Sequence, residues 1–151
     1  GLAAIRAGCT IVTDTQMARS GINKKVLGKF GGQAVCFMSD EDVAAEAKAR
    51  GETRATVSME RAAALMGPVI LAVGNAPTAL VRACELMEAG TFSPALVIGV
   101  PVGFVNVVES KELLASMPGE HIIAMGRKGG SNIAATICNA MLYMASGNAR
   151  E

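Results

Sequence analysis

The sequence predicts a single α/β domain in which helices cover a parallel sheet. Five short apolar runs alternate with segments of helical spacing along the 151 residues. Four of these runs end in turns that contain glycine, proline or capping residues, and a helical pattern then resumes. Hydrophobic residues make up 51% of the chain and charged residues 18%, which supplies a sizeable core and argues against disorder.

Composition excludes several classes of function. The formal net charge is +1 and only 3% of the residues are aromatic, so no basic surface interleaved with aromatic side chains indicates nucleic-acid binding. No apolar run reaches the length of a transmembrane helix, and no signal peptide opens the chain. We therefore expect a cytoplasmic protein with no nucleic-acid and no membrane partner.

The cysteines and the histidine do not form a metal motif. Cys9, Cys36, Cys84 and Cys138 each lie in an apolar segment and form no CxxC pair, so we expect buried, reduced thiols. His121 has no cysteine near it in the sequence. We accordingly expect no metal site.

The first half of the chain alternates two strands with helices. Residues 1–8 resemble the end of a helix closed by Gly8, which leads us to expect a further segment before Gly1. Asp14 or Thr15 can cap a short helix after the first strand. The elements expected in this half are a strand at 9–13, a polar connection at 23–32, a strand at 33–38, a helix from Ser39 or Asp40 to Arg50, a polar link at 53–58 and a helix from Thr56 or Ser58 to Met66.

The second half repeats the strand–turn–helix pattern three times. Pro77 suits the first turn of a helix, and the β-branched run at 95–100 fits a strand buried on both faces. Ser131 can cap the last helix, whose apolar positions recur at helical spacing as far as Gly147. The elements expected are strands at 69–73, 95–100 and 122–125, and helices from Pro77 to Gly90, at 109–117 and from Ser131 to Gly147.

The turns are the candidate functional sites, because loops after parallel strands meet at the carboxyl edge of the sheet, where ligands bind. The segment GRKGGS, residues 126–131, combines free amides at a helix start with Arg127 and Lys128, which suits an anionic group. It is not the phosphate-binding GxxxxGK[ST] motif, because Lys128 precedes Gly129. An ordinary loop with solvated charges explains the segment equally well.

The remaining polar residues have simpler explanations. Asn75 can hydrogen-bond within its own turn, Asp14 can cap a helix, and Arg54 is expected as a solvated charge. Arg19 has no equally simple structural explanation. His121 precedes the last strand, so it should lie at the amino edge, and no catalytic constellation emerges from these spacings.

Five motifs taken together resemble the precorrin-8X methylmutase family, including its cobalt-precorrin-8 branch. They are, in order, VTDTQMARSGI, TRATVSM, VGNAPTAL, GVPVGFVNVVESKELL and GRKGGSNIAATICNAML, and the resemblance covers nearly the whole chain. It implies a flavodoxin-like, three-layer α/β/α fold with five parallel strands in the order 2-1-3-4-5, and a homodimer. It also implies an isomerase that moves a methyl group between neighbouring carbons of ring C of a corrin precursor, giving hydrogenobyrinic or cobyrinic acid, without a cofactor.

The resemblance also implies the site. The family's proton-donating histidine lies upstream of the first motif, so we expect no catalytic residue within 1–151 and a methylmutase-like domain that lacks an N-terminal segment. The macrocycle carries many carboxylates, which basic side chains and backbone amides can bind. The implied substrate-binding residues are Asp14, Thr15, Gln16, Arg19, Thr53, Arg54, Asn75, Thr78, Pro101, Val102, Gly103, Arg127, Lys128, Gly129, Gly130 and Ser131.

Two other functions remain open from the sequence. One is a non-catalytic domain that binds or carries a tetrapyrrole, and the other is a nucleotide-binding flavodoxin-like domain. Binding of a corrinoid would exclude the nucleotide function, and turnover would separate the enzyme from the carrier.

Overall fold

Five parallel strands form one sheet in the order β2-β1-β3-β4-β5 in the computed structural model, which describes residues 1–147. Strand order and direction are as predicted. The strands are β1 (Thr10–Thr13), β2 (Gln33–Val35), β3 (Val69–Val73), β4 (Leu96–Gly99) and β5 (His121–Ile123). The helices are α1 (Leu2–Arg6), α2 (Gln16–Gly21), α3 (Lys24–Lys29), α4 (Glu41–Arg50), α5 (Arg54–Ala63), α6 (Pro77–Glu88), α7 (Val107–Ala115) and α8 (Ser131–Ala145).

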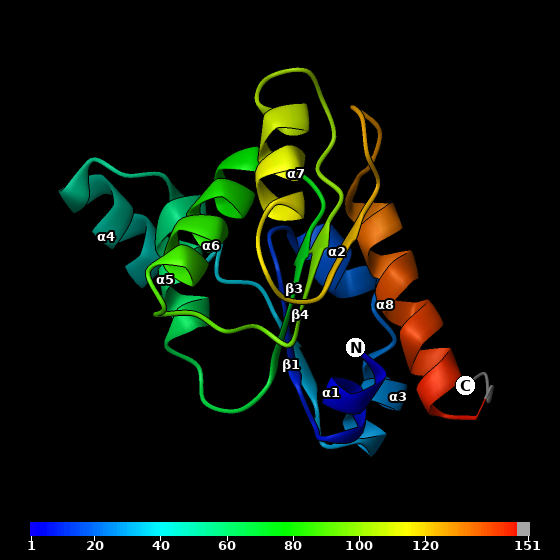
Figure 1. Ribbon diagram of the computed structural model, residues 1–151. Helices are drawn as coiled ribbons and strands as arrows, with labels where there is room; N and C mark the ends of the chain where they lie inside the picture. Colours follow the sequence, from blue (N-terminus) through cyan, green and yellow to red (C-terminus); the bar gives the residue numbers. More distant parts are fainter. Residues whose placement is uncertain (148–151) are drawn as a thin grey trace.

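Alternating side chains of the central strands feed two hydrophobic cores, because neighbouring residues of a strand point to opposite faces. Ile11 packs with buried residues of α1, α2, α3 and α8, and Val12 packs with those of α5 and α6. In Figure 1 the sheet is seen nearly edge-on, with α4, α5 and α6 on one side and α8 on the other. The three-layer, flavodoxin-like fold expected from the resemblance is thereby confirmed.

Two helices differ from the prediction. Residues 23–32 contain α3, whose first turn is capped because the Asn23 side chain accepts a hydrogen bond from Val26 N at 3.1 Å. Burial of Val26 and Leu27 offsets the cost of roughly 1 kcal/mol for Gly28 inside the helix. The expected polar link at 53–58 is wrong, because Thr53 caps α5 and the helix begins at Arg54.

Smaller differences concern the ends of elements. β2 ends at Val35 and β5 at Ile123, earlier than the apolar runs suggested, and α7 begins at Val107. The residue preceding α8 is Gly130, so Ser131 is the first helical residue and not the cap. Its hydroxyl group is thereby available for another partner.

The predicted burial of the cysteines is confirmed. All four thiols are free and buried, and burial raises the pKa of Cys84 to about 11 and that of Cys138 to about 12. Over residues 1–147, no helix is long and apolar enough to cross a membrane. The cytoplasmic location stays a prediction.

Candidate functional site

Four turns at the carboxyl edge of the sheet line one pocket of about 400 Å³. They follow β1, β3, β4 and β5, and each contributes at least one residue. A pocket of this size, formed at the ends of parallel strands, lies in the usual range for small-molecule sites. Its lining consists of Thr15, Met17, Gly74, Asn75, Val102, Gly129, Gly130, Ser131 and Asn132.

Asp14 fixes the turn after β3. Its carboxylate accepts hydrogen bonds from the backbone N–H groups of Gly74, Asn75 and Ala76, at 2.8, 2.8 and 2.6 Å. The side chain is buried, and this desolvation raises the pKa of Asp14 although the three N–H groups act in the opposite direction. Asp14 therefore fixes the shape of the pocket without lining it. Its carboxylate oxygens already accept hydrogen bonds from the turn.

A pair of hydroxyl groups joins two helix starts across the pocket. Thr15 Oγ1 lies 2.7 Å from Ser131 Oγ, and it also accepts a hydrogen bond from Ala18 N at 3.0 Å as the cap of α2. When Thr15 Oγ1 is the donor in this contact, the Ser131 proton is free to point at a ligand.

Two glycines permit the turns to lie this close. A Cβ atom at Gly74 would lie 2.8 Å from Ser131 Cα and 2.9 Å from the Gly130 carbonyl carbon, so the turn after β3 touches the start of α8. A Cβ atom at Gly129 would overlap the carbonyl oxygens of Val100 and Pro101. Backbone packs against backbone at both places, and a larger residue would widen the pocket.

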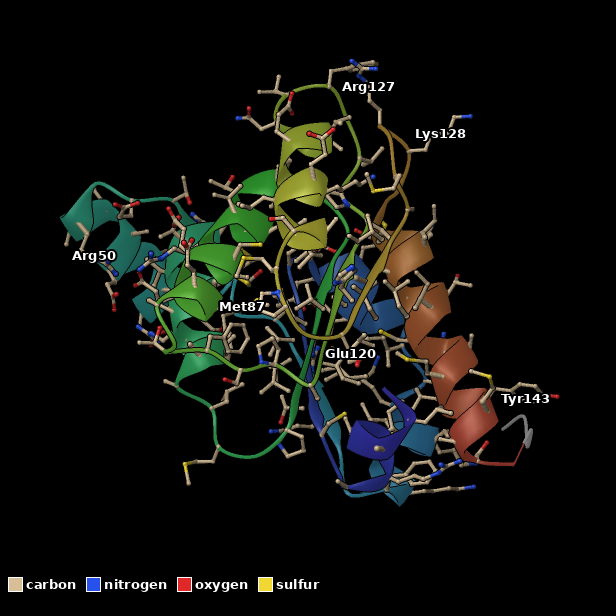
Figure 2. All side chains as sticks on the ribbon, in the orientation of Figure 1. Arg50, Met87, Glu120, Arg127, Lys128 and Tyr143 are labelled. Carbon is tan, nitrogen blue, oxygen red and sulfur yellow. The ribbon has the colours of Figure 1, made fainter. Side chains whose placement is uncertain are left out.

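Arg127 and Lys128 lie on the rim. Both side chains are exposed, and Figure 2 shows them pointing away from the body of the molecule, beyond the loops. The Arg127 guanidinium lies over the Phe104 ring at 6.0 Å from its centroid, within the range of a cation–π contact. The two cations can therefore reach ligand groups outside the pocket, but they do not line it.

The structure brings together only part of the predicted site. Six of the sixteen residues line the pocket, namely Thr15, Asn75, Val102, Gly129, Gly130 and Ser131. The other ten do not: Asp14, Gln16, Arg19, Thr53, Arg54, Thr78, Pro101, Gly103, Arg127 and Lys128. Their role in binding stays a prediction.

Several of those ten residues have a structural task. Arg19 Nε donates to the carbonyl oxygen of Ala34 at 3.0 Å and so ties α2 to β2, which explains its presence without a ligand. Thr53 caps α5, and Arg54 is exposed on the first turn of that helix. Gly103 N donates to the carbonyl oxygen of Arg127 at 3.1 Å and joins the loops after β4 and β5.

Sequence reasoning named Val102 but missed the rest of the apolar part of the site. Met17 lines the pocket and is 66% exposed, although the sequence did not indicate it as a site residue. Of the nine exposed large apolar side chains among the described residues, six belong to these turns or to the helix starts after them. They are Met17, Val102, Phe104, Val105, Met125 and Ile133, which we call the apolar rim. Alternation of exposed methionine, valine and phenylalanine with glycine in the turns was the available signal.

His121 lies at the opposite edge. It is the first residue of β5, and since all strands are parallel it stands at the amino end of the sheet. The pocket is at the carboxyl end, so the single histidine of the chain does not contribute to it.

The fold and the pocket define a flavodoxin-like α/β protein with a ligand-sized site at the carboxyl edge of its sheet. The family model described as precorrin-8X methylmutase matches residues 1–144. A cobalt-precorrin-8 methylmutase of Leptospira interrogans is 44% identical over 97% of this chain and 70% of its own length. One of Salmonella typhimurium is 48% identical over 93% of this chain and 65% of its own length.

Solved structures agree. The crystal structure titled as a precorrin-8x methyl mutase from Thermus thermophilus superposes with a TM-score of 0.87 at 37% identity, covering 97% of this chain and 71% of that chain. The chain belongs to the precorrin-8X methylmutase family, which confirms the resemblance found in the five motifs. It spans about two thirds of the length of the curated relatives that it matches.

Proposed function

We propose that this chain binds a corrin precursor at the carboxyl edge of the sheet and acts in the methyl migration on ring C that yields hydrogenobyrinic or cobyrinic acid in cobalamin biosynthesis. The observation that carries the proposal is the convergence of four family motifs on one pocket in the family's fold. Methylmutases are isomerases, and the family match and the names of the relatives favour this reaction over a carrier or nucleotide-binding function.

The geometry suits a large, flat, acidic ligand. The pocket is small for a complete tetrapyrrole, so it is suited to one edge of the macrocycle, while the apolar rim offers contact to the faces of the ring. Arg127 and Lys128 stand outside the pocket, where the acetate and propionate groups of such a ligand would extend.

The main requirement of the reaction is a fixed orientation of the substrate. Migration of a methyl group between neighbouring carbons is intramolecular: one C–C bond breaks, another forms, and no group leaves. Both reacting carbons already belong to one rigid molecule, so what a site can add is the orientation of that molecule relative to the groups that donate protons to it. The turns at Gly74 and Gly129 are packed backbone against backbone and so provide a rigid wall for the pocket.

In this proposal, residues 1–151 do not include the group that donates the proton to the macrocycle. The family resemblance assigns it to a histidine outside residues 1–151, and His121 lies at the amino edge. A positioned proton donor contributes roughly 10²–10⁴-fold to rate. We therefore expect this chain to bind the macrocycle and to turn over precorrin-8X at least about 100-fold more slowly than a full-length relative.

Titration with hydrogenobyrinic acid, followed by its absorbance spectrum, tests the binding half of the proposal. Saturable binding by the chain, with no competition from flavin mononucleotide, is the expected result. Binding of the flavin in place of the corrinoid would establish the nucleotide function instead. Binding without turnover, in an assay that detects a rate roughly 10⁴-fold below that of a full-length relative, would establish a carrier.

Arg127→Ala tests the rim. A charge-assisted hydrogen bond contributes about 1.5–3 kcal/mol, so we expect the affinity for hydrogenobyrinic acid to fall roughly 10-fold or more. Arg6→Ala is the matched control, because Arg6 is also exposed but lies on α1, before the amino end of β1. Equal affinity of the two variants for hydrogenobyrinic acid would show that Arg127 is a solvated surface charge that does not bind the ligand.

The homodimer is part of the same proposal. Apolar side chains as exposed as Phe104 (86%) and Val105 (78%) are unusual on a monomer and are consistent with cover by a second copy or by the ligand. Light scattering at micromolar concentration should give twice the mass of one chain, and a monomeric mass over the whole accessible concentration range would contradict it.

A further inference from the structure

A single buried lysine lies under the loop that follows β5. Lys111, on α7, has no exposed surface, because it lies on the buried face of that helix with Val107, Ser110 and Leu114. Burial of an ammonium group is costly unless its N–H groups find acceptors. In the described part of the chain no carboxylate forms an ion pair with it. Its partners are therefore the feature to explain.

Both partners of Lys111 are backbone carbonyl groups of one loop. The Nζ atom donates to the carbonyl oxygen of Gly126 at 2.7 Å and to that of Lys128 at 2.9 Å. The carbonyl oxygen between them, that of Arg127, accepts from Gly103 N at 3.1 Å. Three consecutive carbonyl groups are thus held against α7 and the turn after β4.

This arrangement determines what the loop presents to a ligand. Carbonyl oxygens repel carboxylates, and an unrestrained glycine-rich segment could turn them toward the pocket. Gly126, with φ 92°, and Gly130, with φ 129°, occupy backbone conformations that favour glycine, so the loop has the freedom to rearrange. The bonds to Lys111 oppose that rearrangement, and Gly130 N is in turn held by the Val100 carbonyl at 2.8 Å.

We propose that Lys111 is a positioning residue: its ammonium group fastens the carbonyls of Gly126 and Lys128 inward, so that residues 127–131 offer amides and cations, not carbonyl oxygens, to an anionic ligand. This inference rests on the proposed function for the identity of the ligand, but the fastening itself does not depend on the ligand. Burial also lowers the pKa of Lys111, as expected for a cation without a counter-charge.

Lys111→Met removes both hydrogen bonds and keeps most of the length and the apolar character of the side-chain stem. The change leaves the carbonyl groups of Gly126 and Lys128 without this donor, so some loss of global stability is expected and is measured alongside. Met59→Ala is the control, because Met59 is fully buried but lies on α5, and not on α7 or in the loop after β5. Lys111→Gln, which retains a shorter donor, replaces Lys111→Met if the latter fails to fold.

Hydrogen–deuterium exchange without ligand measures the fastening. In Lys111→Met we expect the peptide covering residues 124–131 to exchange at least tenfold faster than in the wild type, while Met59→Ala changes this peptide only in proportion to global stability. Equal exchange of that peptide in the two variants, at equal global stability, would overturn the inference.

Binding of hydrogenobyrinic acid measures the consequence. Lys111→Met should lower the affinity at least tenfold, and adding Arg127→Ala should weaken it by less than a further twofold, because a displaced loop no longer presents the cation. Fully additive losses would reduce Lys111 to a structural residue and overturn the inference. If the wild type does not bind the corrinoid, the proposed function fails, and the exchange experiment still decides the role of Lys111.

Discussion

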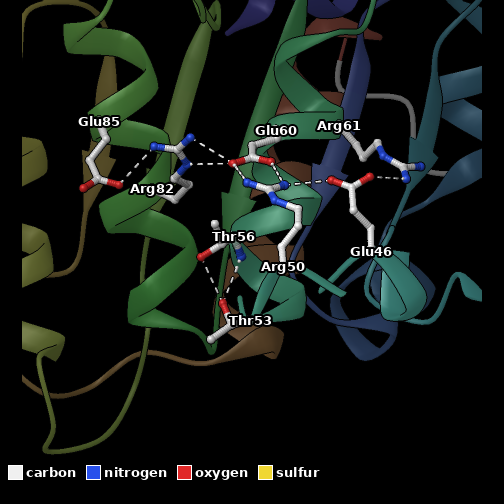
Figure 3. Close-up of polar contacts among 8 residues, drawn as sticks. All are labelled: Glu46, Arg50, Thr53, Thr56, Glu60, Arg61, Arg82 and Glu85. Atoms are coloured by element: carbon white, nitrogen blue, oxygen red, sulfur yellow. Dashed lines mark hydrogen bonds and ion pairs between the residues drawn. The ribbon is translucent and has the colours of Figure 1, made fainter. Parts of the chain in front are cut away.

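Charged side chains have different kinds of partner in two regions of this molecule. At the carboxyl edge, Asp14 and Lys111 are buried singly, and each satisfies its charge with backbone groups of a turn that belongs to the site. On the outer helices, arginines and carboxylates alternate in a chain of ion pairs, shown in part in Figure 3. That chain, which we call the surface network, runs Asp42–Arg61–Glu46–Arg50–Glu60–Arg82–Glu85 across α4, α5 and α6.

The two regions differ in what each charge fixes. The surface network joins helix to helix, and its side chains stay 22–68% exposed, so water and salt screen it. The buried charges join a side chain to the backbone of a loop, where water cannot easily replace the lost partner. We infer that the buried charges determine the geometry of the pocket, whereas the network adjusts the docking of helices that do not line it.

The pH dependence of the two regions should have opposite sign. Arginine partners lower the pKa of Asp42, Glu46 and Glu60, so the network stabilises the fold above the unfolded value of about 4 and loses this contribution as the pH falls through the folded values. Burial raises the pKa of Asp14, so its contribution is fully present below about 3.9 and is lost as the pH rises through its folded value.

The largest effect is expected at Asp14. Asp14→Ala removes the acceptor of three backbone N–H groups, and we expect a loss of about 3 kcal/mol in the free energy of unfolding. For a domain of this length that corresponds to a drop in Tm of roughly 10 °C. Thermal unfolding of the variant beside Asp42→Ala provides the comparison. A drop no larger than that of Asp42→Ala would remove the distinction between the two regions.

The next effect is expected at Gly74. A methyl group there meets the backbone of Gly130 and Ser131, which cannot move aside like the end of a side chain. Overpacking of this kind costs about 1–3 kcal/mol. Gly74→Ala should therefore lower Tm and also break the Thr15–Ser131 contact, with weaker corrinoid binding as the result. Gly28→Ala is the control, since nothing lies within 4 Å of a Cβ atom at that position, and it should be neutral or stabilising.

The smallest effect is expected in the surface network. Glu60 joins Arg50 and Arg82, and Glu60→Gln should lower Tm by no more than about 3 °C at neutral pH. The difference from the wild type should shrink as the pH falls through the lowered pKa of Glu60, and should vanish in 1 M NaCl, where the Debye length is about 3 Å. The effect of Asp14→Ala should persist in the same salt. A salt-resistant loss at Glu60 would show that the network acts like the buried charges.

The sequence predicted whatever depends on local pattern. The apolar run at 69–73 is β3 to the residue, and the turns of glycine and capping residues do meet at one edge. Contacts between distant segments escaped it. Asp14 or Thr15 was expected to cap the helix that follows; Thr15 does so, whereas the partners of Asp14 lie 60 to 62 residues further on. The helix α3 was not predicted because it contains Gly28, and the burial of Val26 and Leu27 that offsets this glycine comes from packing against β2 and the core around it.

The role of Lys111 could not be predicted from the sequence either, because it also depends on contacts with another segment. Lys111 falls within the helix expected at 109–117, but its burial has no explanation without the carbonyl groups that it contacts, which lie 15 and 17 residues further on. Arg127 and Lys128 were expected to reach a ligand because they adjoin a helix start. Whether they do so depends on the path of the loop, which that lysine and Gly103 restrain.

The meeting of α2 with α8 has a consequence for the order of folding. Thr15 contacts Ser131, and the Asn139 side chain accepts from Asn23 N at 2.7 Å and donates to the Gly21 carbonyl at 2.8 Å, each across 116 residues or more. A ribosome must therefore release all five strands before the wall of the pocket can close, and contacts this distant are expected late in folding. Pulse-labelled exchange during refolding should find the Asn23 amide protected after those of β3. The nascent protein acquires its sheet first and its binding site last.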